Sequence, residues 1–216
     1  PTSFMGWDPI REVYAVHMEN CRHRRAPLGK RLIGRSESPD GIVWSEPETI
    51  LVPDPGPGEV LVRIQACGVC HTDLSFTRGL RPIPMPIVLG HEGAGIVQKV
   101  GPGVTRVREG QHFIANPEPF CGMCKFCVGG RSNLCVMRGT PKNLFKMLDG
   151  THRLYRNGEP IHVLLQISTF SDHAVLPEEC VIPIRNDAPL DKVCLIGCGV
   201  MSVSSTSQST SLWSPP

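Results

Sequence analysis

Short segments in which hydrophobic and polar residues alternate make up much of the chain after residue 41, and turns rich in glycine and proline separate them. One segment follows the turn at residues 53–58 and repeats its hydrophobic residues at every second position: Val60, Val62, Ile64 and Ala66. Residues spaced in this way share one face of a strand. The pattern therefore predicts a half-buried strand over residues 59–66.

Other segments predict further strands and one helix. Residues 96–100 and 104–107 flank the turn Gly101-Pro102-Gly103 and are expected to form two strands of a hairpin. Strands are also predicted at residues 112–115, 161–165 and 181–184, and a helix is predicted after Pro189, within residues 190–200. Short strands joined by such turns are typical of an antiparallel barrel or sandwich. The predicted fold class is mainly β with short helices.

The two ends of the chain lack this pattern. Residues 1–40 show no helical or strand period, and residues 20–36 contain six Arg or Lys and no acidic residue. We expect a basic, poorly ordered leader there, and the alternative is a basic arm or an Arg-rich, transit-like segment. Residues 201–216 contain nine Ser or Thr and are expected to be a disordered tail. The folded domain is therefore expected to span residues 41–200.

Composition places the chain among ordinary globular proteins. Its 216 residues leave room for one domain of roughly 150 residues and part of another, and 40% of them are hydrophobic. The formal net charge of +2 gives no electrostatic reason to expect nucleic acid or an anionic membrane as a partner. The longest apolar runs, such as residues 193–196, are far shorter than the ~20 residues that cross a bilayer.

Ten cysteines are the unusual feature of the composition. No signal-peptide pattern opens the chain, so we expect metal binding in a reducing compartment, the cytoplasm, rather than disulfides. Four cysteines have the spacing C-x2-C-x2-C-x7-C in a predicted metal-binding lobe at residues 116–136: Cys121, Cys124, Cys127 and Cys135. Four thiolates leave Zn2+ no open position, so this site is predicted to be structural. The spacing and the few basic residues disfavour an iron–sulfur cluster, a nucleic-acid zinc ribbon or four free cysteines.

A second set of candidate metal ligands is dispersed along the chain. Cys70 follows closely on the strand predicted at residues 59–66, and His91 directly precedes a later strand. Cys198 lies between two glycines near the end of the predicted helix. Two cysteines and one histidine with one open position form a catalytic zinc pattern that is known from alcohol dehydrogenases.

Four motifs in this order resemble the zinc-containing alcohol dehydrogenases of the medium-chain dehydrogenase/reductase superfamily. They are G-V-C-H-T-D at residues 68–73, G-H-E-G-A-G at 90–95, C-G-M-C-K-F-C-x7-C at 121–135 and K-V-C-L-I-G-C-G at 192–199. The resemblance extends from about residue 52 to residue 199. L-D-G-T at 148–151 and S-T-F-S at 168–171 are similar to the longer members, which include the glutathione-dependent formaldehyde dehydrogenases.

The resemblance implies a GroES-like β-barrel as the catalytic domain, with two zinc ions per chain. It implies that Cys70, His91 and Cys198 hold the catalytic zinc, and that the four clustered cysteines hold the structural zinc. Asp73 is then the carboxylate that orients His91, and Glu92 lies beside the metal.

The resemblance also implies a reaction. Zinc acts as a Lewis acid on a small alcohol or a glutathione adduct, and hydride passes to NAD. Thr72 matches the hydroxyl that binds the substrate and relays its proton, and His71 matches a position near the cofactor pyrophosphate. Ser75 stands where some relatives place a histidine as the last base of the relay. Family members form homo-oligomers.

The match to the family stops at residue 199, and the NAD-binding motif G-x-G-x-x-G does not occur in the chain. We therefore expect the catalytic domain of a zinc alcohol dehydrogenase with the Rossmann domain missing, inactive by itself. A truncated zinc-binding remnant without turnover is the first alternative. A zinc-ribbon interaction module is the second.

Overall fold

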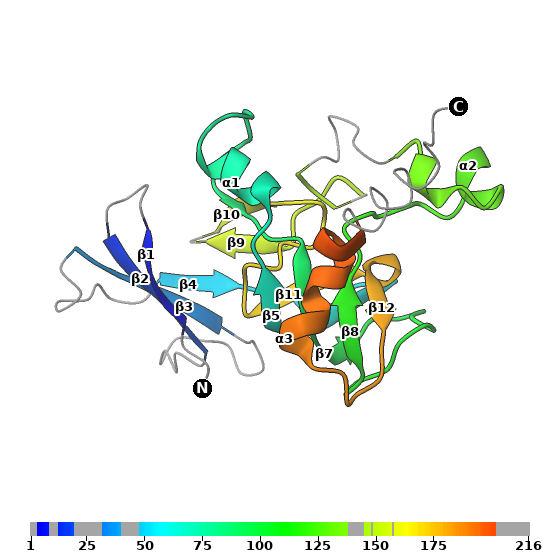
Figure 1. The fold of residues 1–216 in the computed structure, drawn as a ribbon, viewed down its shortest axis with the longest axis horizontal. Helices are drawn as coiled ribbons and strands as arrows, with labels where there is room; N and C mark the ends of the chain where they lie inside the picture. Colours follow the sequence, from blue (N-terminus) through cyan, green and yellow to red (C-terminus); the bar gives the residue numbers. More distant parts are fainter. Residues whose placement is uncertain are drawn as a thin grey trace, which may run out of the picture.

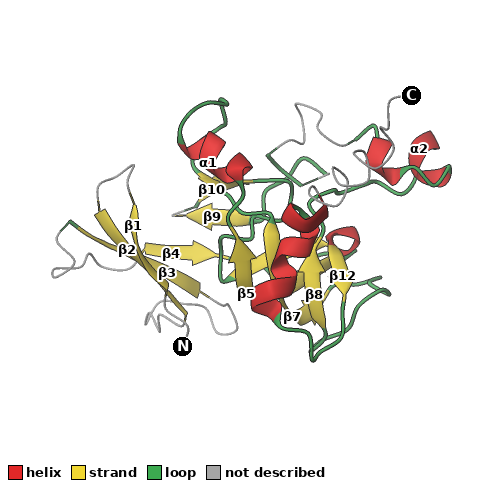
Figure 2. Cartoon of the chain, viewed as in Figure 1, coloured by secondary structure: helices red, strands yellow, loops and turns green. Residues whose placement is uncertain are grey.

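The computed structural model describes residues 4–8, 13–19, 32–39, 48–137, 145–147, 149–156 and 158–201. Strands dominate these residues and the helices are short (Figures 1 and 2). None of the helices in this part of the chain is long and apolar enough to span a membrane. The expectation of a mainly β fold is confirmed.

One sheet has five strands, all antiparallel, in the order β11 (His173–Pro177), β5 (Glu59–Gly68), β7 (Glu92–Val100), β8 (His112–Ala115) and β12 (Val181–Pro183). Strand β5 is the longest, and its last residue, Gly68, pairs with Glu92 at the start of β7. The end of β5 and the start of β7 therefore lie side by side at one edge of this sheet.

The other sheet has seven strands, in the order β1 (Phe4–Asp8), β2 (Val13–Glu19), β3 (Leu32–Ser38), β4 (Glu48–Leu51), β9 (Leu154–Arg156), β10 (Glu159–Val163) and β6 (Ile87–Val88). All neighbours in it are antiparallel except β10 and β6. In Figure 1, β1, β2 and β3 form a ribbon at one side of the molecule.

The helices stand at the ends of strands. Helix α1 (His71–Thr77) follows β5 after a short turn, and α2 (Lys125–Val128) lies in the cysteine-rich segment with the 3-10 helix Ser132–Leu134. A further 3-10 helix, Glu178–Cys180, joins β11 to β12. Helix α3 (Leu190–Val193) runs into the 3-10 helix Cys194–Gly197, and the two pack across β5, β7 and β8 (Figure 1).

Most strands predicted from the alternating pattern are present, as β5, the end of β7, β8, β10 and β12. The predicted strand at residues 104–107 is wrong. The backbone N–H groups of Thr105 and Arg106 donate to the Glu178 carboxylate instead of pairing with a neighbouring strand. Strands β1, β2 and β3 fall within residues 1–40, where no strand was predicted. Of the predicted tail, residues 202–216 lie outside the described residues.

Strand β5 is buried on both faces over residues 59–62, where its pattern predicted a half-buried strand, whereas Gln65 further along is exposed. One face packs in the core of the five-stranded sheet, which includes Val60, Val62, Phe113 and Leu176. The other face packs through Leu61 in a second core, whose members come mainly from β9, β10 and β11: Leu154, Ile161, Val163 and Val175, with Val52 and Met147. Burial on both sides fixes the first half of β5, and near its end the partly buried Cys67 packs against the first core.

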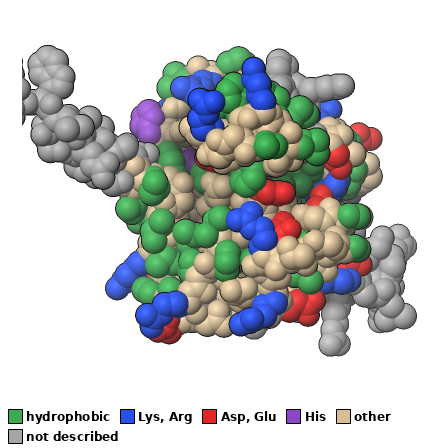
Figure 3. Space-filling model, turned by 90° about the vertical axis from the view of Figure 1, so that its right-hand side faces the viewer, with side chains coloured by type: hydrophobic (Ala, Val, Ile, Leu, Met, Phe, Trp, Pro, Cys, Tyr) green, Lys and Arg blue, Asp and Glu red, His purple; other side chains and the backbone are tan. Residues whose placement is uncertain are grey.

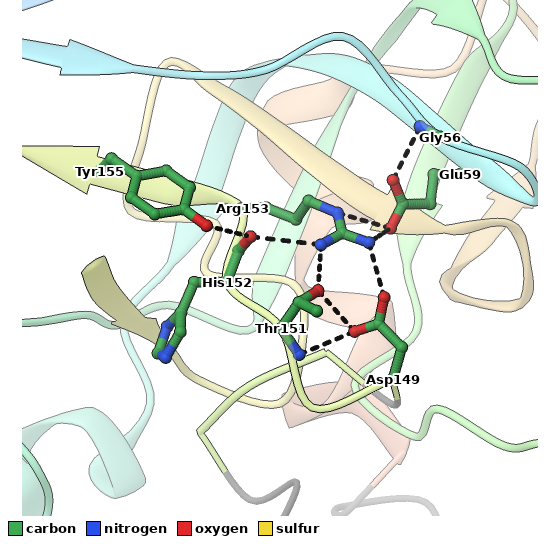
Figure 4. A network of polar contacts seen from close by, with 7 residues as sticks. All are labelled: Gly56, Glu59, Asp149, Thr151, His152, Arg153 and Tyr155. Carbon is green, nitrogen blue, oxygen red and sulfur yellow. Dashed lines mark hydrogen bonds and ion pairs between the residues drawn. The ribbon is translucent and has the colours of Figure 1, made fainter. Parts of the chain in front are cut away.

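A polar network joins the second core to the start of β5 (Figure 4). The Arg153 guanidinium donates from Nε to Glu59 Oε1 at 2.8 Å, and its NH2 group lies 2.9 Å from Asp149 Oδ2. Glu59 Oε2 also accepts from the Gly56 N–H at 2.8 Å. Thr151 donates its N–H and its hydroxyl to Asp149 Oδ1. The network therefore ties the 149–153 segment to β5 through one buried ion pair.

The loop at residues 164–170 has an unusual backbone. Leu165, Gln166 and Ser168 have φ values of 52°, 63° and 41°, in the left-handed region that favours glycine. The loop is nevertheless held against the residues before His91, because Ser168 Oγ donates to Val88 O at 2.7 Å and Thr169 N donates to Gly90 O at 2.9 Å. Strain of this kind persists only where surrounding contacts fix it.

We expect Gln166→Gly to be about 1 kcal/mol more stable than Gln166→Ala, because glycine adopts a positive φ without strain. Gln166 Oε1 is buried without a hydrogen-bond partner in the described part of the chain, so neither variant loses a bond at that atom. Urea unfolding of Gln166→Gly and of Gln166→Ala measures the effect. Alanine removes the same amide but keeps the strain, so the glycine variant should be the more stable of the two. An equal or lower stability of Gln166→Gly would contradict the expectation.

Candidate metal centres

The predicted four-cysteine cluster comes together in space. The sulfur atoms of Cys121, Cys124, Cys127 and Cys135 all lie within 4.8 Å of one another. Cys124 stands at the N-terminal end of α2 and Cys127 lies within it, with their sulfurs 3.5 Å apart. Cys135 follows the 3-10 helix Ser132–Leu134, and its sulfur is 3.6 Å from that of Cys121. Gly122 and Gly130 turn the chain with φ values of 71° and 74°.

Backbone N–H groups favour thiolates in this lobe. The N–H groups of Cys127 and Val136 donate to the Cys124 sulfur and lower the pKa of this thiol to about 6. Burial and the neighbouring Cys124 raise the pKa of Cys127 to about 12, since a second negative charge is costly beside the first. Four converging sulfurs that repel one another as thiolates fit a soft cation such as Zn2+.

The dispersed set also converges. Donor atoms of Cys70, His91, Glu92 and Cys198 all lie within 4.8 Å of one another, and the two sulfurs are 4.0 Å apart. Cys70 is the residue before α1, His91 and Glu92 come at the start of β7, and Cys198 follows the 3-10 helix Cys194–Gly197. The fold therefore joins residues that are up to 128 positions apart in the sequence. The three residues of the predicted zinc pattern are together, and Glu92 adds a fourth donor.

Asp73 holds two sides of this centre in place. Its side chain is buried, and its two oxygens accept from the backbone N–H of Cys70 at 3.1 Å and of Gly90 at 3.0 Å. Its Oδ1 lies 3.4 Å from Nδ1 of the buried His91, an ion-pair distance that is long for a hydrogen bond. Burial raises the pKa of Asp73, but His91 and the two N–H donors outweigh it and lower the pKa below its ordinary value. With Nδ1 turned to Asp73, Nε2 is left for the centre.

The charges at the centre favour the binding of a cation. Burial raises the pKa of the Cys198 thiol to about 11, with the nearby Cys70 and Glu92 adding to the effect. Burial acts in the same direction on Cys70, but hydrogen bonds from Thr72 and His91 bring its pKa below the ordinary value. Two thiols and one carboxylate thus face a single imidazole, and a divalent cation would compensate their negative charge.

The other predicted site residues lie on α1. The backbone N–H and the hydroxyl of Thr72 both lower the pKa of the Cys70 thiol. His71 is exposed, and Ser75 Oγ lies 3.3 Å from its Nδ1 and donates to its carbonyl oxygen at 2.9 Å.

Two residues that were not predicted, Cys67 and Thr169, also border the centre. Cys67 has its sulfur 3.0 Å from Thr169 Oγ1, and burial raises the pKa of its thiol to about 11.

Residues 56–186 match the model of the family described as the alcohol dehydrogenase GroES-like domain. An S-(hydroxymethyl)glutathione dehydrogenase of Paracoccus denitrificans is 47% identical over 148 residues, which are 68% of this chain and 40% of the relative. An alcohol dehydrogenase class-3 of Dictyostelium discoideum is 42% identical over 165 residues, 74% of this chain and 44% of the relative.

Solved structures show the same relation. An alcohol dehydrogenase zinc-binding domain protein from Burkholderia ambifaria matches with a TM-score of 0.66 and 36% identity, over 74% of this chain and 43% of that one. A benzyl alcohol dehydrogenase from Acinetobacter calcoaceticus matches with a TM-score of 0.64 and 31% identity, over 72% and 41%. This chain thus spans about 40% of the length of the relatives it matches. The matched family model covers more than half of the chain, and the chain belongs to the alcohol dehydrogenase GroES-like domain family.

Proposed function

We propose that the chain is the zinc-binding catalytic part of an NAD-dependent alcohol dehydrogenase. The observation that carries this proposal is the convergence of Cys70, His91, Glu92 and Cys198 on one point at the edge of the five-stranded sheet. In this proposal the catalytic domain spans residues 41–200, with a zinc lobe at 116–136.

Two zinc ions per chain fit the two donor sets. The four-cysteine set would hold a structural ion, and Cys70, His91 and Cys198 would hold the catalytic one, with Glu92 beside it. When bound, the catalytic zinc supplies a Lewis acid that polarises the oxygen of the substrate alcohol. Asp73 fixes His91 and the backbone of Cys70, so the ligand geometry is set before any substrate arrives.

The remaining roles concern the substrate and the cofactor. We assign the Thr72 hydroxyl, which lies against the Cys70 sulfur, to binding the alcohol and passing on its proton. His71 is exposed beside it and is assigned to the pyrophosphate of NAD. An alcohol or a glutathione adduct is the proposed substrate class, since relatives include S-(hydroxymethyl)glutathione dehydrogenases.

The proposed compartment and the proposed class of partner rest on the cysteines and on the surface charge. None of the nine cysteines in the described residues forms a disulfide bond, which favours a reducing compartment, the cytoplasm. On the face shown in Figure 3, the coloured side chains of both charge signs are interspersed with apolar ones, which supports a small-molecule substrate rather than nucleic acid. We also propose a homo-oligomer, because members of the family form homo-oligomers.

Zinc analysis of the purified 216-residue chain tests the proposal. We expect about two zinc ions per chain, and about one in His91→Ala, whereas the control His152→Ala should keep two. With NAD and a panel of alcohols, including S-hydroxymethylglutathione, we expect no zinc-dependent NADH formation by these residues alone. The described sheets are antiparallel except for β10 and β6 and contain no βαβ unit to hold the nicotinamide. One zinc ion or none in the parent chain would overturn the assignment.

A further inference from the structure

Gly68 and Glu92 face each other across the pair β5 and β7. Side chains at directly opposed positions of an antiparallel pair lie on the same side of the sheet. Gly68 has no side chain, and the Glu92 side chain occupies the vacant space. A β-carbon added to Gly68 would lie 2.2 Å from Glu92 Oε2 and 3.2 Å from Glu92 Cβ. The carboxylate therefore lies almost directly on the backbone of residue 68.

The other walls of this space are also specific. Glu92 is only 3% exposed, so little open space surrounds its carboxylate. Gly199, just after Cys198, approaches from the far side, where an added β-carbon would lie at an ordinary 3.5 Å from Glu92 Oε1. Leu195 Cδ2 would be 2.4 Å from a β-carbon on Gly68, but Leu195 is 41% exposed and can turn away.

We propose that Gly68 is a positioning residue whose missing β-carbon seats the Glu92 carboxylate against the Cys70, His91 and Cys198 donors. This inference rests on the proposed metal site. A methyl group at residue 68 and the carboxylate cannot share the same space, and the backbone of β5 is held by two cores over residues 60–64, by Cys67 against the first core, and by its pairing with β7 up to Gly68. Glu92 must then give way and leave the donor set.

The experiment measures how strongly the centre holds zinc. The zinc-loaded 216-residue chain is titrated with the chromogenic chelator 4-(2-pyridylazo)resorcinol, and zinc release is followed for each site. We expect Gly68→Ala to weaken zinc at the Cys70 centre by about 10- to 100-fold, the range for loss of a group that supports a metal site. Zinc in the four-cysteine lobe serves as the internal reference and should be unchanged.

The decisive measurement is the double variant. Glu92→Ala should weaken zinc as much as Gly68→Ala, and Gly68→Ala in the Glu92→Ala background should cause no further loss, because the carboxylate has already gone. The matched control Gly199→Ala adds a methyl group near the same carboxylate at a permitted distance and should leave zinc release unchanged.

An unchanged zinc affinity in Gly68→Ala would overturn the inference. A loss in the double variant equal to the product of the single losses would also overturn it. Should Gly68→Ala fail to fold, Glu92→Ala and Leu195→Ala added to it remove both close contacts and should restore folding; failure to do so also overturns it. A parent chain that holds zinc only in the four-cysteine lobe would instead contradict the proposed function.

Discussion

Replacing Cys124 with serine is expected to reduce the zinc content from about two ions per chain to about one and to unfold the cysteine-rich lobe. The thiolate of Cys124 is favoured, since two N–H groups lower its pKa to about 6. Structural zinc contributes on the order of 10 kcal/mol to the folding of small metal-binding units. The lobe has little apolar burial of its own, and Met123 and Val128 are largely exposed. Without the ion, no comparable interaction holds together the segment that carries the four cysteines.

The loss should remain local. Helix α2 lies at the edge of the molecule, away from the two sheets (Figure 1). Metal analysis gives the zinc count, and amide hydrogen exchange gives the order of residues 121–136 against that of β5 and β7. We expect protection to disappear in the lobe and to persist in the strands. Met123→Ser changes an exposed side chain of the same lobe and should retain both ions. An unchanged zinc count in Cys124→Ser would rule out the four-cysteine assignment.

The sequence was most informative where chemistry and local spacing coincide. The cysteines at 121–135 are close in the chain, so regular spacing alone predicts that their sulfurs can meet. Cys70 and Cys198 are 128 positions apart, and the catalytic zinc pattern of two cysteines and one histidine, rather than their spacing, placed them in one set. The strands β8 and β12 could also be predicted from short local segments, and their buried residues lie in a single core.

Features that depend on tertiary contacts were not predictable from a pattern. Residues 104–107 follow the turn Gly101-Pro102-Gly103 as the second strand of a hairpin would, but the N–H groups of Thr105 and Arg106 donate to the Glu178 carboxylate instead of to a partner strand. Likewise, Leu165 and Gln166 have a positive φ, which neither leucine nor glutamine signals in a sequence. The loop conformation depends on its hydrogen bonds to residues 88–90. The contact between the Glu92 side chain and Gly68 could not be predicted without the register in which β5 pairs with β7.

Arg153→Met is expected to lower the free energy of unfolding by about 3 kcal/mol, since it leaves a buried carboxylate without its cation. Arg153 NH2 lies 2.6 Å from Glu59 Oε1, and their side chains are 19% and 9% exposed. The Gly56 N–H would remain as a donor to Glu59, but it carries no full charge. Methionine keeps much of the length of the arginine side chain, so the loss reports charge pairing more than packing.

The double variant Glu59→Gln, Arg153→Met separates two effects of Arg153→Met: the loss of the ion pair and the burial of an unpaired Glu59 carboxylate. Glutamine keeps an oxygen for the Gly56 N–H and removes the negative charge, so we expect the double variant to recover most of the stability that Arg153→Met loses. Urea unfolding of the parent, both single variants and the double variant completes the cycle. Arg185→Met is the matched control: Arg185 pairs with Asp187 in solvent, and its loss should leave stability unchanged. If Arg153→Met is no more destabilising than this control, the network in Figure 4 does not anchor the 149–153 segment to β5.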